Sequence, residues 1–227
     1  MKRAALLLAL ALAGCGGHYA TFTLPEEGPV QPGQYEWQPR REAVLKTGAV
    51  DTLNPSVVPW RDSLINLYSV FDGRTWHTEA AISKDGFEWN GAQRILSPSP
   101  GSWEGGYIAA NGAGIAFQGE LLYFYQAGNP PRIGLVRSED SKVWTRESNP
   151  VLELGPRGAW DERAAADPYV VQADGRLYLY YLGEDRARRQ RLGLAVSGDG
   201  RSCRWPWGLE FRTRNTSRRW RSSQTQR

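Results

Sequence analysis

A repeat with a period of about 57 residues is the feature that most restricts the fold of this chain. Asn54, Asn111 and Asp167 begin three similar segments, and the steps between them are 57 and 56 residues. Trp103 and Trp160 recur at the same spacing, and an acidic residue follows each of them. A fixed period of this size is typical of architectures that stack one supersecondary unit several times.

Each copy of the repeat contains three strand-like runs and a fourth near a tryptophan. Residues 121–125 and 177–181 consist of aliphatic and aromatic side chains without polar alternation, so we expect both faces of the sheet to be buried. Turn-forming pairs punctuate such runs; they are Asp85-Gly86, Asp174-Gly175 and Asp199-Gly200. A four-stranded unit of this length, stacked face to face, is a blade of a β-propeller. We therefore predict an all-β fold of four-stranded propeller blades, about three of which lie in this chain.

The N-terminal residues are set apart from the repeat. Lys2 and Arg3 precede an unbroken Ala/Leu run over residues 4–13. This run is too short to span a bilayer, which takes about 20 residues in a helix, and it has the character of the apolar part of a signal peptide. The run leads into Leu-Ala-Gly-Cys at residues 12–15, a motif that resembles the bacterial lipobox.

The lipobox resemblance implies cleavage before Cys15 and attachment of lipid to that cysteine. We expect an exported protein that lipid anchors to the bacterial cell envelope; the alternative is an ordinary secreted protein in which Cys15 is incidental. The predicted organisation is a signal peptide over residues 1–14, a tether rich in Pro and Gly over 15–41, and a partial propeller over 42–200.

The partial propeller is predicted to begin with a closing strand. Ala-Val-Leu-Lys at residues 43–46 matches the outer-strand stretches that end at Leu96 and Leu152. A propeller can close when an N-terminal strand completes its last blade, which removes the open sheet edges. We therefore expect residues 43–46 to be such a strand.

Residues 201–227 break the repeat and change the charge. They contain eight Arg and one acidic residue, Glu210, whereas residues 1–200 carry 20 basic and 23 acidic side chains. Position 203 is Cys, although the repeat predicts Trp six residues after Ser197. A basic tail can bind nucleic acid or anionic lipid, but the abrupt loss of the pattern favours a stretch translated out of frame. We predict no nucleic-acid partner.

Two motifs resemble a known group of proteins. Asp-Pro-Tyr-Val at residues 167–170 and Ser-Lys-Asp-Gly-Phe-Glu-Trp at 83–89, together with the period, are similar to the five-bladed propellers of the arabinanase, levansucrase and invertase superfamily. That superfamily includes glycoside hydrolase families 32, 43 and 130. The resemblance covers roughly residues 35–200 and implies a complete fold of five blades, of which this chain would hold three.

The resemblance also implies three acids at the starts of the inner strands, facing a central funnel. They serve as a nucleophile or base, a transition-state stabiliser and a general acid. Asp167 occupies one such position and is the strongest catalytic candidate, with a cap of an Asp-Pro turn as the alternative. Asn54 and Asn111 occupy the other two inner-strand starts. Because an amide cannot ionise, we assign these two residues to substrate binding.

Three further acids follow the repeated tryptophans. Glu104 follows Trp103, and Asp161 and Glu162 follow Trp160. We predict these acids as catalytic candidates, because they recur one blade apart and glycosidases typically use a pair of carboxylates. The alternative is a structural repeat in which the acids accept hydrogen bonds from backbone N–H groups.

The loops after the second strand of each copy are expected at one end of the propeller. Planar aromatic and bidentate polar side chains suit sugars, whose faces stack and whose hydroxyls need paired partners. The predicted substrate-binding residues are Asn54, Asn111, Asp72, Trp76, His77, Trp103, Trp160 and Glu184, and the same loops hold Gln126, Asn129, Asp185 and Arg186. For each loop residue, a solvated loop is the alternative.

These patterns predict a glycoside hydrolase-like, exported lipoprotein whose partners are carbohydrate and the membrane. The alternatives are a non-catalytic carbohydrate-binding lipoprotein on the same scaffold and a protein-interaction fragment. The sequence contains no zinc-type ligand cluster, no phosphate-binding Gly loop and no convincing Ser-His-Asp set. We therefore predict neither a metal nor a cofactor.

Overall fold

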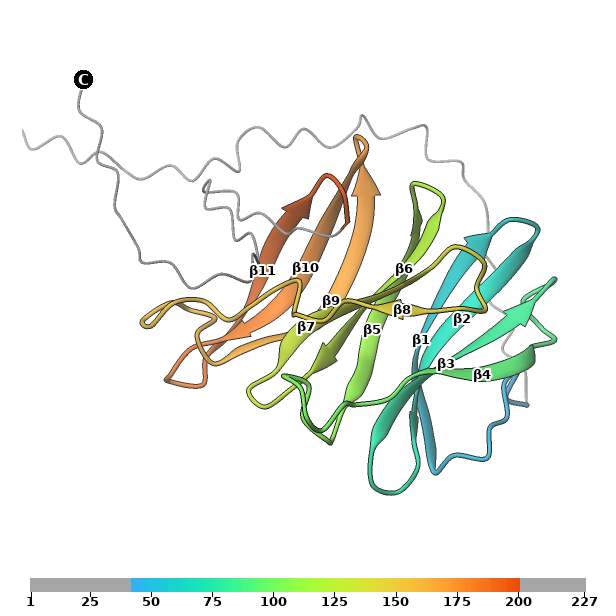
Figure 1. Cartoon of the computed structure of the whole chain (residues 1–227), viewed down its shortest axis with the longest axis horizontal. Helices are drawn as coiled ribbons and strands as arrows, with labels where there is room; N and C mark the ends of the chain where they lie inside the picture. Colours follow the sequence, from blue (N-terminus) through green and yellow to red (C-terminus); the bar gives the residue numbers. More distant parts are fainter. Residues whose placement is uncertain (1–41, 201–227) are drawn as a thin grey trace, which may run out of the picture. The chain divides into compact units, whose positions relative to one another are not determined.

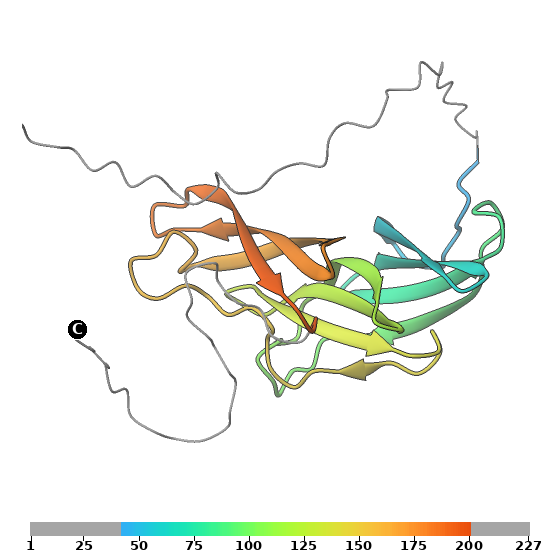
Figure 2. The same cartoon turned by 90° about the horizontal axis from the view of Figure 1, so that it is seen from above.

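The computed structural model describes residues 42–200, which form strands and turns and no helix. Figure 1 shows three antiparallel sheets side by side, and Figure 2 shows the same succession from above. The first sheet contains β1 (Asp51–Trp60), β2 (Ser63–Phe71), β3 (Trp76–Ser83) and β4 (Asn90–Leu96). The second contains β5 (Ala109–Phe117), β6 (Glu120–Ala127), β7 (Arg132–Ser138) and β8 (Thr145–Arg146). The third contains β9 (Ala164–Ala173), β10 (Arg176–Glu184) and β11 (Gln190–Ser197).

The three sheets are the blades of a propeller. Within each sheet the strands follow chain order from the inside outward, and the first strands β1, β5 and β9 lie against one another in turn. This arrangement confirms the predicted all-β fold of propeller blades, three of which lie in residues 42–200. The third blade has three strands within the described range, and the residues where the repeat breaks lie outside that range. No helix in that range could cross a membrane.

The core lies between the blades. Ile65 and Leu67 of the first blade pack with Leu121 of the second, and Leu122 and Phe124 of the second blade pack toward the third. Leu121 and Leu122 are neighbours on β6 that point to opposite faces, and both are buried. The continuous apolar run over β6 therefore reflects a strand that is covered on both sides, as the sequence predicted. The same prediction is wrong for residues 177–181 of β10, where burial alternates and Tyr180 is 38% exposed.

The predicted turns are present, and their side chains explain a sequence motif. Asp174 and Gly175 both have positive φ, 49° and 69°, which suits a two-residue hairpin between β9 and β10. Between β3 and β4, Ser83 Oγ accepts hydrogen bonds from the backbone N–H of Asp85 and of Gly86. Equivalent bonds hold the turns after β7 and β11. The Ser-x-Asp motif is therefore a structural turn.

Residues 43–46, where we predicted a closing strand, form no strand in the described structure; the prediction concerns pairing with a last blade that the described residues do not include. Residues 42–50 form no strand; instead Leu45 and Ala49 pack against Tyr68 and Val70 on the outer side of the first blade. A strand requires a neighbouring strand for its backbone groups, and no described edge pairs with residues 43–46. The predicted signal peptide (1–14) with Cys15, the tether (15–41) and the basic tail (201–227) lie outside the described residues.

Candidate functional site

Three polar side chains from successive blades meet at one end of the sheets. Asn54, Asn111 and Asp167 lie near the starts of β1, β5 and β9. Asn54 Nδ2 donates to Asn111 Oδ1 at 2.9 Å, and Asn111 Nδ2 donates to Asp167 Oδ1. We call these three residues the polar row. The structure thus brings together the inner-strand starts that the repeat predicted, although they are 57 and 56 positions apart in the chain.

The backbone explains why these side chains meet. Asn54, Asn111 and Asp167 have φ of 53°, 52° and 48°, in the left-handed region that Asn and Asp tolerate better than other non-glycine residues. The strand register shifts at each of these positions. Such bulges re-aim a side chain that would otherwise follow the alternation of the strand. The row therefore depends on a repeated backbone distortion.

The carboxylate of Asp167 determines which way the amides of the row point. An ionised carboxylate only accepts hydrogen bonds, so Asn111 must offer its Nδ2 group to Asp167 and its Oδ1 to Asn54. Asn54 then donates through its own Nδ2. The row is an ordered chain of donors that ends on the negative charge.

Glu104 lies outside this row and is buried. Its side chain is 1% exposed and forms an ion pair with Arg146 Nη1 at 2.7 Å. It also accepts hydrogen bonds from the hydroxyl of Tyr125 and the backbone N–H of Ser99. Trp103 stacks on Tyr125 with the ring centroids 6.2 Å apart. Burial and the neighbouring Glu104 carboxylate raise the pKa of Tyr125.

Asp161 repeats this arrangement in the third blade. It is buried and accepts a hydrogen bond from the hydroxyl of Tyr181 at 2.9 Å, while Trp160 stacks on Tyr181 at 5.6 Å. Burial raises the pKa of Asp161. Each Trp-acid pair therefore fastens the loop before a blade to a tyrosine on that blade's second strand. These contacts favour the structural alternative for Glu104 and Asp161.

Glu162 is also held by structural contacts. It forms an ion pair with Arg186 Nε at 2.8 Å and accepts a hydrogen bond from the backbone N–H of Gly158 at 2.7 Å. Its side chain is 7% exposed, so little of the carboxylate faces solvent. The contacts match the alternative in which this acid binds backbone N–H groups.

The loop residues of the first blade form a connected group. His77 is buried; its Nε2 lies 3.0 Å from Asp72 Oδ2 and its Nδ1 lies 2.9 Å from Ser97 Oγ. The His77 ring N–H and two backbone N–H groups hold the pKa of Asp72 well below its usual range. Trp76 stacks on Phe71 at 5.0 Å. Sequence reasoning missed Ser97, because no local pattern links it to a histidine 20 residues earlier.

The third blade contains a similar set of contacts in the corresponding loop. There Asp185, at the position equivalent to Asp72, forms an ion pair with Arg191 of β11 at 3.0 Å. Backbone N–H groups, first that of Arg189, and the Arg191 side chain lower the pKa of Asp185 to about 2. Glu184 next to it pairs with Arg188 at 3.0 Å. In both blades an acid thus holds the loop to the start of the third strand.

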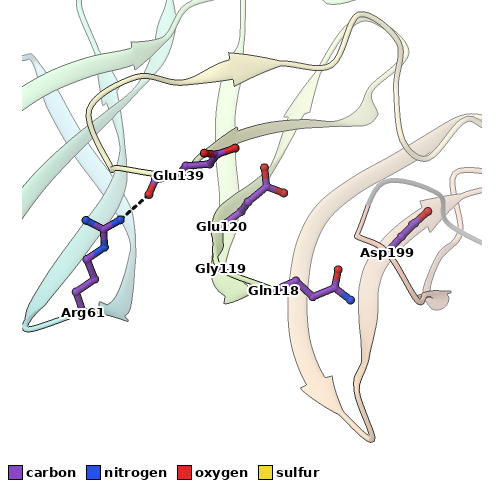
Figure 3. A pocket seen from close by; sticks show the side chains of 6 residues that line it. All are labelled: Arg61, Gln118, Gly119, Glu120, Glu139 and Asp199. Carbon is purple, nitrogen blue, oxygen red and sulfur yellow. Dashed lines mark hydrogen bonds between the residues drawn. The ribbon is translucent and has the colours of Figure 1, made fainter.

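The loops and the polar row occupy the same end of the blades, as predicted. In each blade the start of the first strand pairs with the end of the second; the pairs are Asp51 with Phe71, Ala109 with Ala127 and Ala164 with Glu184. The other end carries the hairpins and a pocket, shown in Figure 3. Its lining residues are Arg61, Gln118, Gly119, Glu120, Glu139 and Asp199. The pocket contains no member of the polar row, which remains the candidate site.

Within residues 42–200, no group of three or more His, Cys, Asp or Glu side chains is arranged to hold a metal ion. The row itself consists of one carboxylate and two amides. Such groups recognise hydroxyls by donating and accepting hydrogen bonds. The arrangement suits a ligand rich in hydroxyl groups.

Comparison with known proteins identifies others with a similar sequence or fold. No protein-family model matches the chain. A 1,2-β-oligomannan phosphorylase of Thermoanaerobacter sp. (strain X514) is 29% identical over 127 residues, which cover 51% of this chain and 41% of that protein. A family 117 glycoside hydrolase of Zobellia galactanivorans has a similar structure, with a TM-score of 0.60, 19% identity, and coverage of 69% of this chain and 56% of that one.

A third similar protein is from the GH130 family of mannoside phosphorylases. That family is described as containing glycoside hydrolases that target β-1,2 mannosidic linkages in Candida mannan. The structures align with a TM-score of 0.54 and 19% identity over 68% of this chain and 48% of that one. The chain spans about half the length of the proteins that it matches. Residues 42–200 have a β-propeller fold similar to that of these glycoside hydrolases.

Proposed function

We propose that this chain forms part of a glycoside hydrolase-like protein that binds and cleaves carbohydrate at the polar row. The observation that carries the proposal is the convergence of Asn54, Asn111 and Asp167 from three blades. The repeat placed these residues at the inner-strand starts, where the resembling enzymes hold their functional acids. β-1,2-linked mannosides are the first ligands to test, because two of the similar proteins act on such linkages or belong to a family that does.

The side chains of the row have distinct roles in this proposal. Asp167 is the carboxylate that exchanges a proton with the substrate, and Asn54 and Asn111 bind sugar hydroxyls. Most glycosidases flank the scissile bond with two carboxylates. The described residues supply one carboxylate to the row, so Asp167 carries whatever acid–base chemistry these blades perform.

A second candidate function is carbohydrate binding without cleavage. Asn54 and Asn111 favour it, because neither amide can act as a base or a nucleophile. In a protein that only binds carbohydrate, Asp167 is a further hydrogen-bond acceptor for a sugar hydroxyl. The scaffold alone does not decide between the two functions, since one fold hosts many activities.

The test uses the full chain with β-1,2-linked manno-oligosaccharides, and measures binding by calorimetry and cleavage by release of reducing sugar, with and without phosphate. Asp167→Asn is compared with Asp174→Asn, a matched control in the hairpin at the other end of β9. Loss of cleavage with binding retained in Asp167→Asn supports the enzyme. Binding without any cleavage by the unaltered chain supports the second function. If no glycan of any class binds, both functions are rejected.

We also propose that Cys15 carries the lipid that anchors the protein to the bacterial envelope. The basic start, the apolar run over residues 4–13 and the Leu-Ala-Gly-Cys motif support this proposal. Several acyl chains give firm anchoring, since each buried CH₂ contributes about 0.8 kcal/mol. Metabolic labelling with a fatty acid should mark the natural chain and leave Cys15→Ala unlabelled. Equal labelling of both chains would reject the assignment.

A further inference from the structure

Gln126 contacts two members of the polar row at once. It is half-buried near the end of β6. Its Oε1 accepts a hydrogen bond from Asn111 Nδ2 at 3.2 Å and another from the backbone N–H of Asp167 at 3.2 Å. One side-chain oxygen thus connects the second blade's row residue with the backbone of the third blade's.

The first blade uses the same device one repeat earlier. Ser69 lies on β2, 57 positions before Gln126, and its Oγ accepts a hydrogen bond from the backbone N–H of Asn111 at 2.9 Å. In both blades, a polar residue of the second strand therefore holds the bulged residue of the next blade's first strand. The equivalent position in the third blade is Leu182, whose side chain cannot accept a hydrogen bond.

These hydrogen bonds matter because the bulged conformation is intrinsically unfavourable. A non-glycine residue in the left-handed region is disfavoured unless the surroundings hold it there. Asp167 has φ of 48°, and its backbone N–H points to Gln126 rather than into the strand ladder. Within the described residues, no hydrogen bond reaches the second carboxylate oxygen of Asp167, so that atom is available to a ligand.

We propose that Gln126 is a positioning residue for the row. Resting on the proposed function, it orients Asp167 and Asn111 so that the free carboxylate oxygen of Asp167 meets a sugar hydroxyl. Gln126 acts through these two residues. The acceptor oxygen is the essential feature, because both hydrogen bonds end on it.

The experiment compares three variants of the full chain: Gln126→Leu, which removes the acceptor at similar size; Gln126→Glu, which keeps it; and Gln172→Leu, a control at an exposed glutamine of β9. Amide hydrogen exchange and the Asn111 side-chain amide resonance are followed by NMR. In Gln126→Leu, exchange of the Asp167 amide should accelerate about tenfold and the Asn111 resonance should move. Gln126→Glu should restore slow exchange, and Gln172→Leu should match the unaltered chain.

A second measurement follows binding of β-1,2-linked mannobiose. Gln126→Leu should weaken binding about fivefold to tenfold, as expected for loss of one or two neutral hydrogen bonds. Unchanged amide exchange in Gln126→Leu, or equal loss in the Leu and Glu variants, overturns the positioning role. Fast exchange combined with unaltered sugar affinity also overturns it. If exchange responds as expected but the unaltered chain binds no glycan, the positioning stands and the proposed function fails.

Discussion

At the scale of single residues, the site depends on side chains that tolerate an unusual backbone. Asn54, Asn111 and Asp167 occupy the left-handed region, where their short polar side chains also form the row. The two requirements select the same residue types, since Asn and Asp are the non-glycine residues that adopt this conformation most readily. Backbone geometry and side-chain hydrogen bonding are therefore coupled at these positions.

Two substitutions at Asn111 separate the requirement for a left-handed backbone from the requirement for side-chain hydrogen bonds. Asn111→Gly removes the side chain but suits the backbone, whereas Asn111→Ala removes the same hydrogen bonds and also strains a φ of 52°. We expect the Ala variant to be less stable than the Gly variant by about 1 kcal/mol. Urea unfolding of the two variants measures the difference. Equal stabilities would mean that the backbone at Asn111 is not left-handed in solution.

The contributions of Asp161 and Asp185 to stability should change with pH in opposite directions. The pKa of Asp161 is raised by burial, so the folded state favours its protonated form. The stabilisation from that proton is present below the ordinary pKa of an Asp and is lost as pH rises through the raised value. Asp161→Asn, which keeps an acceptor for Tyr181, should therefore gain stability relative to the unaltered chain between pH 3 and pH 7. Unfolding free energies of both chains across this range test the sign.

Asp185 should respond in the opposite direction. Its folded pKa is lowered to about 2 by backbone N–H groups and by Arg191, so its contribution is present above the ordinary pKa of an Asp. That contribution is lost as pH falls from about 4 toward 2. Asp185→Asn should be less stable than the unaltered chain at pH 7, and the difference should shrink in acid. A constant difference across the range would contradict the lowered pKa.

At the scale of elements, a tyrosine joins each pair of tryptophan and acid to its blade. The ring of this tyrosine packs over a glycine of the neighbouring strand. Tyr125 on β6 lies opposite Gly134 on β7, and a Cβ added at Gly134 would lie 2.4 Å from Cζ of the tyrosine. Gly193 meets Tyr181 in the same way, at 2.5 Å. The missing side chain lets the ring lie flat, so that its hydroxyl reaches the acid.

A methyl group at Gly134 should break this fastening. Gly134→Ala forces the Tyr125 ring away from Glu104, and we expect a loss of about 1–3 kcal/mol of stability from overpacking. Gly48→Ala is the control, because a Cβ at Gly48 meets nothing within 4 Å. Thermal unfolding of the two variants checks the prediction. Similar midpoints would indicate that the tyrosine can move without loss.

At the scale of the whole described unit, burial between blades provides the stability. Leu122 is 2% exposed between the second and third blades, whereas Leu192 on the third blade is 84% exposed. The difference arises because the second blade is covered on both faces, whereas among the described residues the third blade packs against the second blade alone. Leu122 should therefore contribute much more to the stability of the fold than Leu192.

This contrast can be measured with one type of substitution. Leu122→Ala should cost about 2–5 kcal/mol, since it removes buried methyl groups and leaves a cavity. Leu192→Ala should change stability by no more than about 0.5 kcal/mol. Chemical denaturation of both variants gives the two values. Comparable losses would show that Leu192 is covered in solution.

The amino-acid sequence by itself determined the period, the strands, the Asp-Gly turns and the blade architecture, because these follow from local residue types that recur at fixed intervals. It did not determine which repeated polar residues are buried and which lie together in an exposed row. Glu104 and Asp167 both occupy positions that repeat with the blades, yet one is buried against Tyr125 and Arg146 while the other ends an exposed row. Only the tertiary structure decided this, since burial and the contacts across 57 residues depend on how the blades pack and where their first strands bulge.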